Sequence, residues 1–175
     1  FGLLADKGFR GLRIDEVARR SGVPKSTIYR RWPSLVDLAV DAVDTAMGSR
    51  ECEPGEDPLA DLSAIIVRAH AFFTTSPLSG SLPQIALGLI GHPEAQAAYR
   101  DRIIAPLRNG AIDAVTRAAA AGRWQGPDPT TSVDMMIGAI VYRFNYLGHA
   151  ADLDEAFEVA EAVARRPLPR PEATR

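Results

Sequence analysis

The sequence predicts an all-α protein, and three observations support this class. Apolar residues recur at intervals of three and four, residues that can cap a helix start precede these segments, and no alternating run of β-branched residues occurs. We expect about nine helices, near residues 1–7, 14–21, 25–31, 34–48, 58–75, 82–90, 93–121, 129–147 and 153–165.

Side-chain oxygens mark the helix starts and glycines mark the ends. Ser34 with Asp37, and Asp152 with Glu155, have the spacing of a capping box. Two further starts, at residues 57–58 and 128–129, place an aspartate directly before a proline. The glycines expected to end helices in the left-handed conformation are Gly8, Gly22, Gly91, Gly122 and Gly148.

The composition is that of an ordinary folded protein, with 46% hydrophobic and 24% charged residues. The longest dense apolar stretch, residues 135–142, is far shorter than the roughly 20 residues of a membrane helix, so we expect no membrane partner. The single cysteine, Cys52, cannot form an internal disulfide, and no secretory leader pattern is present, which predicts a cytoplasmic protein. Phe1 is not a Met and lies inside an apolar helical pattern, so we expect residues to precede it.

Charge is distributed unevenly along the chain. Residues 1–40 contain eight Lys or Arg and four acids, whereas the remainder contains 12 basic and 18 acidic residues. A basic N-terminal part followed by an acidic remainder predicts that one end binds a polyanion; the alternative is a chance cluster on a solvated face. We expect a head at residues 1–48, a body at residues 49–175, a mobile junction at residues 49–57 and a frayed tail after Arg166.

Residues 14–32, IDEVARRSGVPKSTIYRRW, have the pattern of a helix-turn-helix. The first helix places Ile14, Val17, Ala18 and Ser21 on one face, Gly22 allows the turn, and Val23 is expected to fill the space between the helices. On the second helix Ile28 and Trp32 face inward. Ser26, Thr27 and Arg30 therefore face outward, flanked by Lys25 and Tyr29, as a helix in the DNA major groove requires.

The segment LLADKGFRGLRIDEVARRSGVPKSTIYRRWPSLVDL resembles the N-terminal domain of the TetR family of transcriptional regulators, over about residues 1–48. The resemblance implies a three-helix DNA-binding head and a C-terminal helical bundle that binds a ligand and dimerises. It also implies a regulator, typically a repressor, that binds a palindromic double-stranded operator DNA as a homodimer and is released by a small-molecule inducer. The expected DNA contacts are Arg13, Lys25, Ser26, Thr27, Tyr29, Arg30, Arg31 and Ser34.

Two positions depart from the family pattern. Arg13 stands where the family often has a Ser or Thr helix cap, and it would reach a phosphate instead. Leu35 stands where a Lys is common, which leaves phosphate binding at that helix start to Ser34 and the free N–H groups beside it.

Two apolar stripes near the C-terminal end predict a homodimer interface. The alternative is that both stripes pack inside one monomer. The residues assigned to dimerisation are Val133, Ile137, Ile140, Phe144, Phe157, Ala160 and Ala164.

The body is expected to bind a small hydrophobic effector in an apolar pocket with a few polar groups. Candidate lining residues are Phe72, Phe73, Leu87, Tyr99, Ile103, Met136 and Asn145, each of which has a place in the core as its alternative. Pro106 should kink the helix at residues 93–121. Arg143 either anchors an acidic ligand or pairs with Glu158 or Asp134.

No motif for catalysis, a cofactor or a metal site is expected. His70, His92 and His149 lack metal-ligand spacing, and the sequence contains no G-x-S-x-G, Walker, H-E-x-x-H or dinucleotide-binding pattern. Two alternatives remain open at this point: a helical enzyme whose site is spread over distant helices, and a helical small-molecule-binding or interaction protein that does not bind operator DNA.

Overall fold

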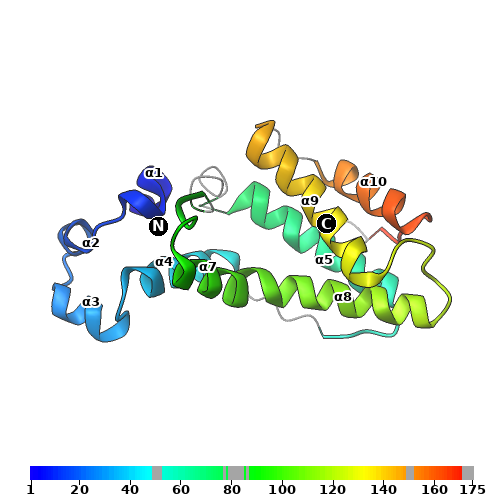
Figure 1. The fold of residues 1–175 in the computed structure, drawn as a ribbon, viewed down its shortest axis with the longest axis horizontal. Coiled ribbons are helices and arrows are strands. Elements are labelled where there is room, and N and C mark those ends of the chain that lie inside the picture. The colour runs from blue at the N-terminus through cyan, green and yellow to red at the C-terminus, as the bar shows by residue number, and fades with distance from the viewer. Residues whose placement is uncertain (49–52, 77, 79–84, 86, 149–151, 171–175) are drawn as a thin grey trace. The chain divides into compact units, whose positions relative to one another are not determined.

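The computed structural model describes residues 1–48, 53–76, 78, 85, 87–148 and 152–170, which form helices joined by turns and loops, with no strand (Figure 1). The predicted all-α class is confirmed. The chain divides into two compact units: unit 1 comprises Phe1–Ser49 and Ser76–Ala105, and unit 2 comprises Arg50–Thr75 and Pro106–Arg175. Within the described residues, no helix is long and apolar enough to cross a membrane.

Unit 1 contains the N-terminal helices and a second, later segment. Its helices are α1 (Gly2–Gly11), α2 (Ile14–Ser21), α3 (Lys25–Arg31), α4 (Leu35–Met47) and α7 (Pro93–Tyr99), followed by a π-helical turn, η2 (Arg100–Ile104). The segment 76–105 groups with the head rather than with the rest of the body because α7 and η2 pack against α4. The core of this unit includes Leu4, Phe9, Ile28, Val40 and Ile103.

The turn between α2 and α3 depends on Gly22. This residue has φ 69° and ψ 7°, the left-handed conformation that ends α2. A Cβ added there would meet no atom within 4 Å, so the glycine is required for its backbone angle and not for space. Val23, expected to fill the space between the helices, remains 37% exposed and fills it only in part.

A π-helical turn interrupts the long helix expected at residues 93–121. The N–H of Ala105 donates to the carbonyl oxygen of Arg100, five residues earlier, and α8 (Ala105–Ala120) follows. Pro106 has no N–H for the carbonyl of Arg102, and its ring would clash with that carbonyl in a regular α-helix. A wider turn directly before the proline relieves this clash.

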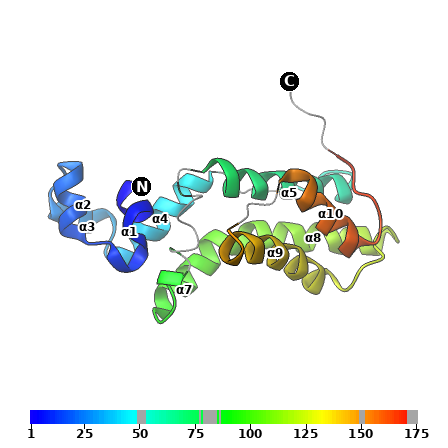
Figure 2. The ribbon, with the colours of Figure 1, turned by 90° about the horizontal axis from the view of Figure 1, so that it is seen from above.

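Unit 2 contains α5 (Pro58–Thr75), nearly all of α8, α9 (Pro129–Tyr146) and α10 (Leu153–Ala164). Helix α10 packs on α9 and on α5, as Figure 2 also shows. The four helices share one apolar core, whose fully buried members include Leu59, Leu62, Val115, Val133, Phe157 and Ala164.

Most of the predicted helix starts and several of the predicted ends are confirmed. Ser34 with Asp37, and Asp152 with Glu155, form complete capping boxes, and the carboxylates of Asp57 and Asp128 accept backbone N–H groups at the starts of α5 and α9. All five glycines expected to end helices have positive φ, but Gly8, with φ 61° and ψ −176°, forms a kink inside α1, which continues to Gly11; the expected end of the first helix at residue 7 is therefore wrong. The helix expected at residues 82–90 lies largely outside the described residues.

Two segments expected to be loose are held in place where they are described. Asp57 forms an ion pair with Arg123, and the N–H of Gly55 donates to Asp61. After α10, Arg166 donates to the carbonyl of Arg123, and Leu168 is buried in the core of unit 2. Side chains distant in sequence thus contact residues 53–57 and 166–170, which argues against the predicted mobile junction and frayed tail in these described parts.

Candidate nucleic-acid interface

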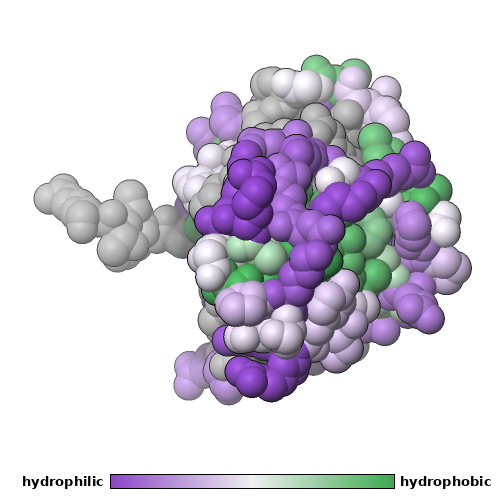
Figure 3. Space-filling model, turned by 90° about the vertical axis from the view of Figure 1, so that its left-hand side faces the viewer, coloured by the Kyte–Doolittle hydropathy of each residue, from purple (hydrophilic) through white to green (hydrophobic). Residues whose placement is uncertain are grey.

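Helix α3 presents its polar side chains to solvent and one residue to the core. Ile28 is 3% exposed. Figure 1 draws α2 and α3 at the left, and Figure 3, seen from that side, shows many hydrophilic side chains together with some hydrophobic ones. The exposed side chains of α3 are Lys25, Ser26, Thr27, Tyr29, Arg30 and Arg31, as the sequence predicts.

Trp32 fixes the C-terminal end of α3. Its backbone N–H donates to the carbonyl of Ile28, and its indole Nε1 donates to Oδ2 of Asp41 on α4 at 2.9 Å. The guanidinium of Arg31 lies 4.8 Å from the centre of the indole ring. Trp32, which is predicted to face inward, thus also ties α3, the helix expected to enter the DNA major groove and here called the recognition helix, to α4.

The basic side chains predicted to contact phosphates differ in the partners they have within the protein. Arg13 is exposed and its Nη1 donates to the carbonyls of Arg10 and Leu12, both at 2.9 Å, so it holds the end of α1. Lys25 pairs with Asp15 of α2 at 2.5 Å. Arg30 has no ion-pair partner among the described residues, which leaves its five donors for a ligand.

Ser34 is exposed at the start of α4, but its hydroxyl already has partners. The Oγ accepts the N–H of Asp37 at 3.1 Å and donates to the Asp37 carboxylate at 2.7 Å. A phosphate at this helix start would compete with the capping box for the hydroxyl.

Models of two domains match nearly the whole chain. The N-terminal model, described as bacterial regulatory proteins of the tetR family, matches residues 1–42, and the tetracyclin repressor-like C-terminal domain matches residues 54–163. The chain belongs to the TetR family.

Similar proteins agree with this assignment. The HTH-type transcriptional regulator YdeS of Bacillus subtilis (strain 168) is 28% identical over 152 residues, covering 85% of this chain and 75% of YdeS. The crystal structure of the TetR family transcription regulator SCO0332 matches with a TM-score of 0.70 and 26% identity, over 96% of this chain and 93% of that one. The transcriptional regulator FadR from Bacillus subtilis, solved in complex with stearoyl-CoA, has the same fold, with a TM-score of 0.71, 16% identity and coverage of 93% and 92%. The chain is thus a TetR family transcriptional regulator.

The residues predicted to line an effector pocket divide between the two units. Leu87, Tyr99 and Ile103 belong to unit 1; Phe72, Phe73 and Met136 belong to unit 2, and the side chain of Asn145 lies outside the described residues. Leu87 is exposed and lines a shallow hollow with Lys7, Arg10 and Ile90. Burial raises the pKa of Tyr99, which keeps its phenol protonated.

In unit 2 the aromatic candidates form a cluster. The rings of Phe72 and Phe73 meet edge to face at 5.6 Å, and the ring of Phe73 lies 5.3 Å from that of Phe144. Met136 is buried in the neighbouring core. Phe144, assigned by sequence to dimerisation, therefore contacts an aromatic side chain of its own unit.

The residues assigned to the dimer interface face the core of unit 2. Val133, Phe157, Ala160 and Ala164 are buried, and Ile137 and Ile140 pack against the same core. These stripes serve the monomer because α9 and α10 cover each other and α5. The exposed apolar side chains of α9 and its end lie elsewhere, at Met135, Tyr142, Tyr146 and Leu147.

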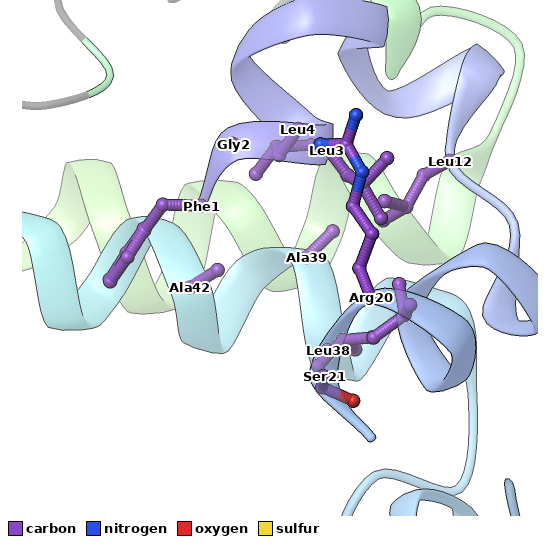
Figure 4. A pocket seen from close by; sticks show the side chains of 11 residues that line it. Phe1, Gly2, Leu3, Leu4, Leu12, Arg20, Ser21, Leu38, Ala39 and Ala42 are labelled. Carbon is purple, nitrogen blue, oxygen red and sulfur yellow. The ribbon is translucent and has the colours of Figure 1, made fainter. Parts of the chain in front are cut away.

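Two features of the structure were not found from sequence. Arg143 pairs with Glu155 at 3.4 Å, not with Glu158 or Asp134, and Asp134 pairs with Arg108 instead. A pocket of about 250 Å³, open to solvent, lies between α1, α2 and α4 of unit 1, where Arg20 extends beside the leucines of α1 (Figure 4). Among the described residues there is no cluster that could hold a metal ion.

Proposed function

We propose that this TetR family regulator binds palindromic operator DNA as a homodimer in the cytoplasm and represses transcription until a small hydrophobic effector releases it. The observation that carries the proposal is the exposed polar face of α3. Small hydroxyls at Ser26 and Thr27 allow close approach to base edges, and Arg30 has a free planar donor set for guanine. We expect the phosphates around it to be contacted by four further exposed side chains, Arg13, Lys25, Tyr29 and Arg31.

The second chain is proposed to cover the exposed side of α9. Met135, Gly138, Tyr142 and Tyr146 follow one another at helical spacing, and the rings of Tyr142 and Tyr146 stack at 5.7 Å. These large apolar side chains are exposed in the monomer, with Tyr146 at 70%. Aromatic side chains of this kind are enriched at protein interfaces.

The effector is proposed to be a mostly hydrophobic molecule that contacts the aromatic cluster of Phe72, Phe73 and Phe144. FadR, whose fold this chain shares, is known with stearoyl-CoA, which supports a long apolar ligand. An effector releases DNA only when it binds the DNA-incompetent state more tightly, by about 1.4 kcal/mol for each tenfold loss of operator affinity.

The DNA proposal is tested by selecting bound sequences from a random duplex pool with the full chain. We expect a palindromic motif whose affinity falls steeply with salt, with a slope near −0.9 per neutralised phosphate. The absence of an enriched motif, together with salt-independent binding, would contradict the proposal.

The dimer surface is tested by light scattering of Tyr142→Glu and Tyr146→Glu, with Thr130→Glu as an exposed control on the same helix. We expect the mass of one chain for the first two variants and of two chains for the control. Dimers in all three variants would place the interface elsewhere.

The effector is tested with fatty acids and acyl-CoA thioesters of increasing chain length. Binding should raise the melting temperature of the wild-type chain and weaken its operator complex, and Phe73→Ala should reduce both effects. If the ligands raise the melting temperature of wild type and Phe73→Ala equally, the aromatic cluster does not contact the effector.

A further inference from the structure

Asp41 on α4 joins two elements that are far apart in sequence. Its Oδ2 accepts the indole N–H of Trp32, at the end of the recognition helix, at 2.9 Å. Its Oδ1 accepts Nη2 of Arg102, in the π-helical turn η2, at 2.6 Å. The same Nη2 also donates to Oδ2 of Asp44, one turn further along α4, at 3.1 Å.

The cluster of Asp41, Asp44 and Arg102 is held together by attraction between the arginine and the two carboxylates. Hydrogen bonds from Trp32 and from Arg102 lower the pKa of Asp41, so its carboxylate is ionised at neutral pH. All three charged side chains are half-buried, which reduces screening by solvent relative to a fully exposed pair. A carboxylate held by two donors on opposite oxygens has little freedom to rotate.

Arg102 is itself held in place by its neighbour. Ile103 is buried in the core of unit 1, and the turn that contains both residues is the π-helical turn. Such turns occur often at functional sites because they change the direction of side chains within a helix. Arg102 therefore approaches α4 from a fixed backbone.

We propose that Arg102 is a positioning residue for the recognition helix, acting through the Asp41 carboxylate on the Trp32 indole. This inference rests on the proposed binding of DNA by α3. The guanidinium sets the orientation of the carboxylate, the carboxylate holds the indole, and the indole fixes the end of the helix whose outward side chains contact DNA. Loss of Arg102 leaves the carboxylate with one donor and allows α3 to sample other positions.

The test uses the full chain with Arg102→Met and, as a matched control, Arg117→Met, which removes an arginine that also bridges two aspartates, but in unit 2. The first readout is the indole N–H signal in a ¹⁵N–¹H spectrum. The chain has two tryptophans, Trp32 and Trp124, and Trp32→Phe assigns the signals. We expect Arg102→Met to shift the Trp32 signal and leave that of Trp124 in place, whereas Arg117→Met leaves the Trp32 signal unchanged.

The second readout is affinity for the selected operator. Arg102→Met should weaken it about tenfold, and the effects of Arg102→Met and Trp32→Phe should be smaller in combination than their sum, because both act through Asp41. Arg102→Lys keeps the positive charge and is included in case Arg102→Met does not fold. It should give an intermediate operator affinity and a smaller shift of the Trp32 signal.

An unmoved Trp32 signal in Arg102→Met would overturn the proposal, as would an equal loss of affinity in Arg117→Met. If the wild-type chain selects no DNA, the proposed function fails, while the Trp32 signal still decides whether Arg102 holds the indole.

Discussion

Arg102 in unit 1 and Arg117 in unit 2 have the same chemistry, because each bridges two aspartates. Arg117 donates to Asp61 at 2.7 Å and to Asp113 at 2.8 Å, and its third contact is the backbone carbonyl of Gly55 at 3.2 Å. The cluster around Arg102 ends instead on the indole of Trp32, at the end of α3.

The clusters around Arg102 and Arg117 differ in the part of the chain that each one holds in place. Exposed and half-exposed ion pairs add little to the free energy of unfolding, so neither arginine is expected to dominate stability. Arg117 holds the loop at Gly55 beside the apolar core of unit 2, whereas Arg102 is proposed to orient α3, whose exposed polar face is proposed to bind DNA. Two arginines with the same partners therefore have different consequences: loss of Arg117 should loosen a loop of unit 2, whereas loss of Arg102 should affect the position of α3.

The largest expected effect concerns the core of unit 2. Phe157→Ala should lower the free energy of unfolding by about 3–5 kcal/mol, because the ring is 1% exposed and its loss leaves a cavity. Chemical denaturation measures this loss. Thr130→Ala, at an exposed side chain of α9 outside the proposed dimer surface, is the control and should change the free energy of unfolding by no more than about 0.5 kcal/mol. Equal losses in the two variants would show that the exposed side also supports the monomer.

The next largest effect concerns operator binding by α3 in unit 1. Tyr29→Ala and Arg30→Ala should each weaken operator binding by about 1–3 kcal/mol, roughly tenfold to a hundredfold, while the melting temperature stays near that of wild type. Both side chains are exposed and add nothing to the core. Fluorescence anisotropy with labelled operator gives the affinity. Arg100→Ala, an exposed arginine paired only with its neighbour Asp101 among the described residues, is the control and should bind as wild type does.

Acid should destabilise both units. Hydrogen bonds to Trp32 and Arg102 lower the pKa of Asp41 in unit 1, and bonds to Arg123 and Arg108 lower those of Asp57 and Asp134 in unit 2. A carboxyl whose pKa is lower in the folded state stabilises the protein above its unfolded value of about 3.9, and this contribution is lost as the pH falls through the folded value. The melting temperature should therefore hold from pH 7 to about 5 and fall below about 4.

The contribution of Asp41 to the acid response can be tested by comparing the pH dependence of the melting temperature in two variants. Asp41→Asn should make the melting temperature less dependent on pH below 4, whereas Glu158→Gln, on an exposed side chain, should reproduce the wild-type profile. A profile that is identical in wild type and Asp41→Asn would remove Asp41 from this role.

The smallest expected effect distinguishes the stability of the monomer from the affinity of the dimer. Gly138 lies in α9, and a Cβ there would meet no described atom within 4 Å, so Gly138→Ala should raise monomer stability by about 0.5–1 kcal/mol. The same methyl group lies on the proposed dimer surface and should raise the dissociation constant measured by sedimentation. By contrast, a Cβ at Gly126 would overlap the carbonyl oxygen of Val163, so Gly126→Ala should be destabilised. Gly138→Ala chains that dimerise as tightly as wild type would move the interface away from this residue.

Local features of the fold could be predicted because their causes lie within a few residues. The capping box of Ser34 and Asp37 joins positions three apart, and the left-handed turn at Gly22 follows from one residue. The exposed face of α3 followed in the same way, since burial of Ile28 determines which side chains point outward.

Features that depend on distant partners could not be predicted. The spacing of Phe157, Ala160 and Ala164 shows that α10 has an apolar face, but the sequence does not show whether α5 and α9 or a second chain covers it. The acidic partner of Arg143 was missed for the same reason, because several acids lie within reach of a long side chain. Pro106 indicated an interrupted helix, but the π-helical form of the turn was not predicted.

The burial of Leu168 has a consequence for synthesis of the chain on the ribosome. The core of unit 2 joins Leu62 of α5 to Leu168, so the first helix of this unit is made about a hundred residues before the segment that completes its core. At roughly 5–20 residues per second, translation takes about 5–20 s to cover this distance. During this interval the apolar face of α5 is exposed to water and to chaperones. The rate at which α8, α9 and α10 emerge therefore governs how long the nascent regulator is open to aggregation.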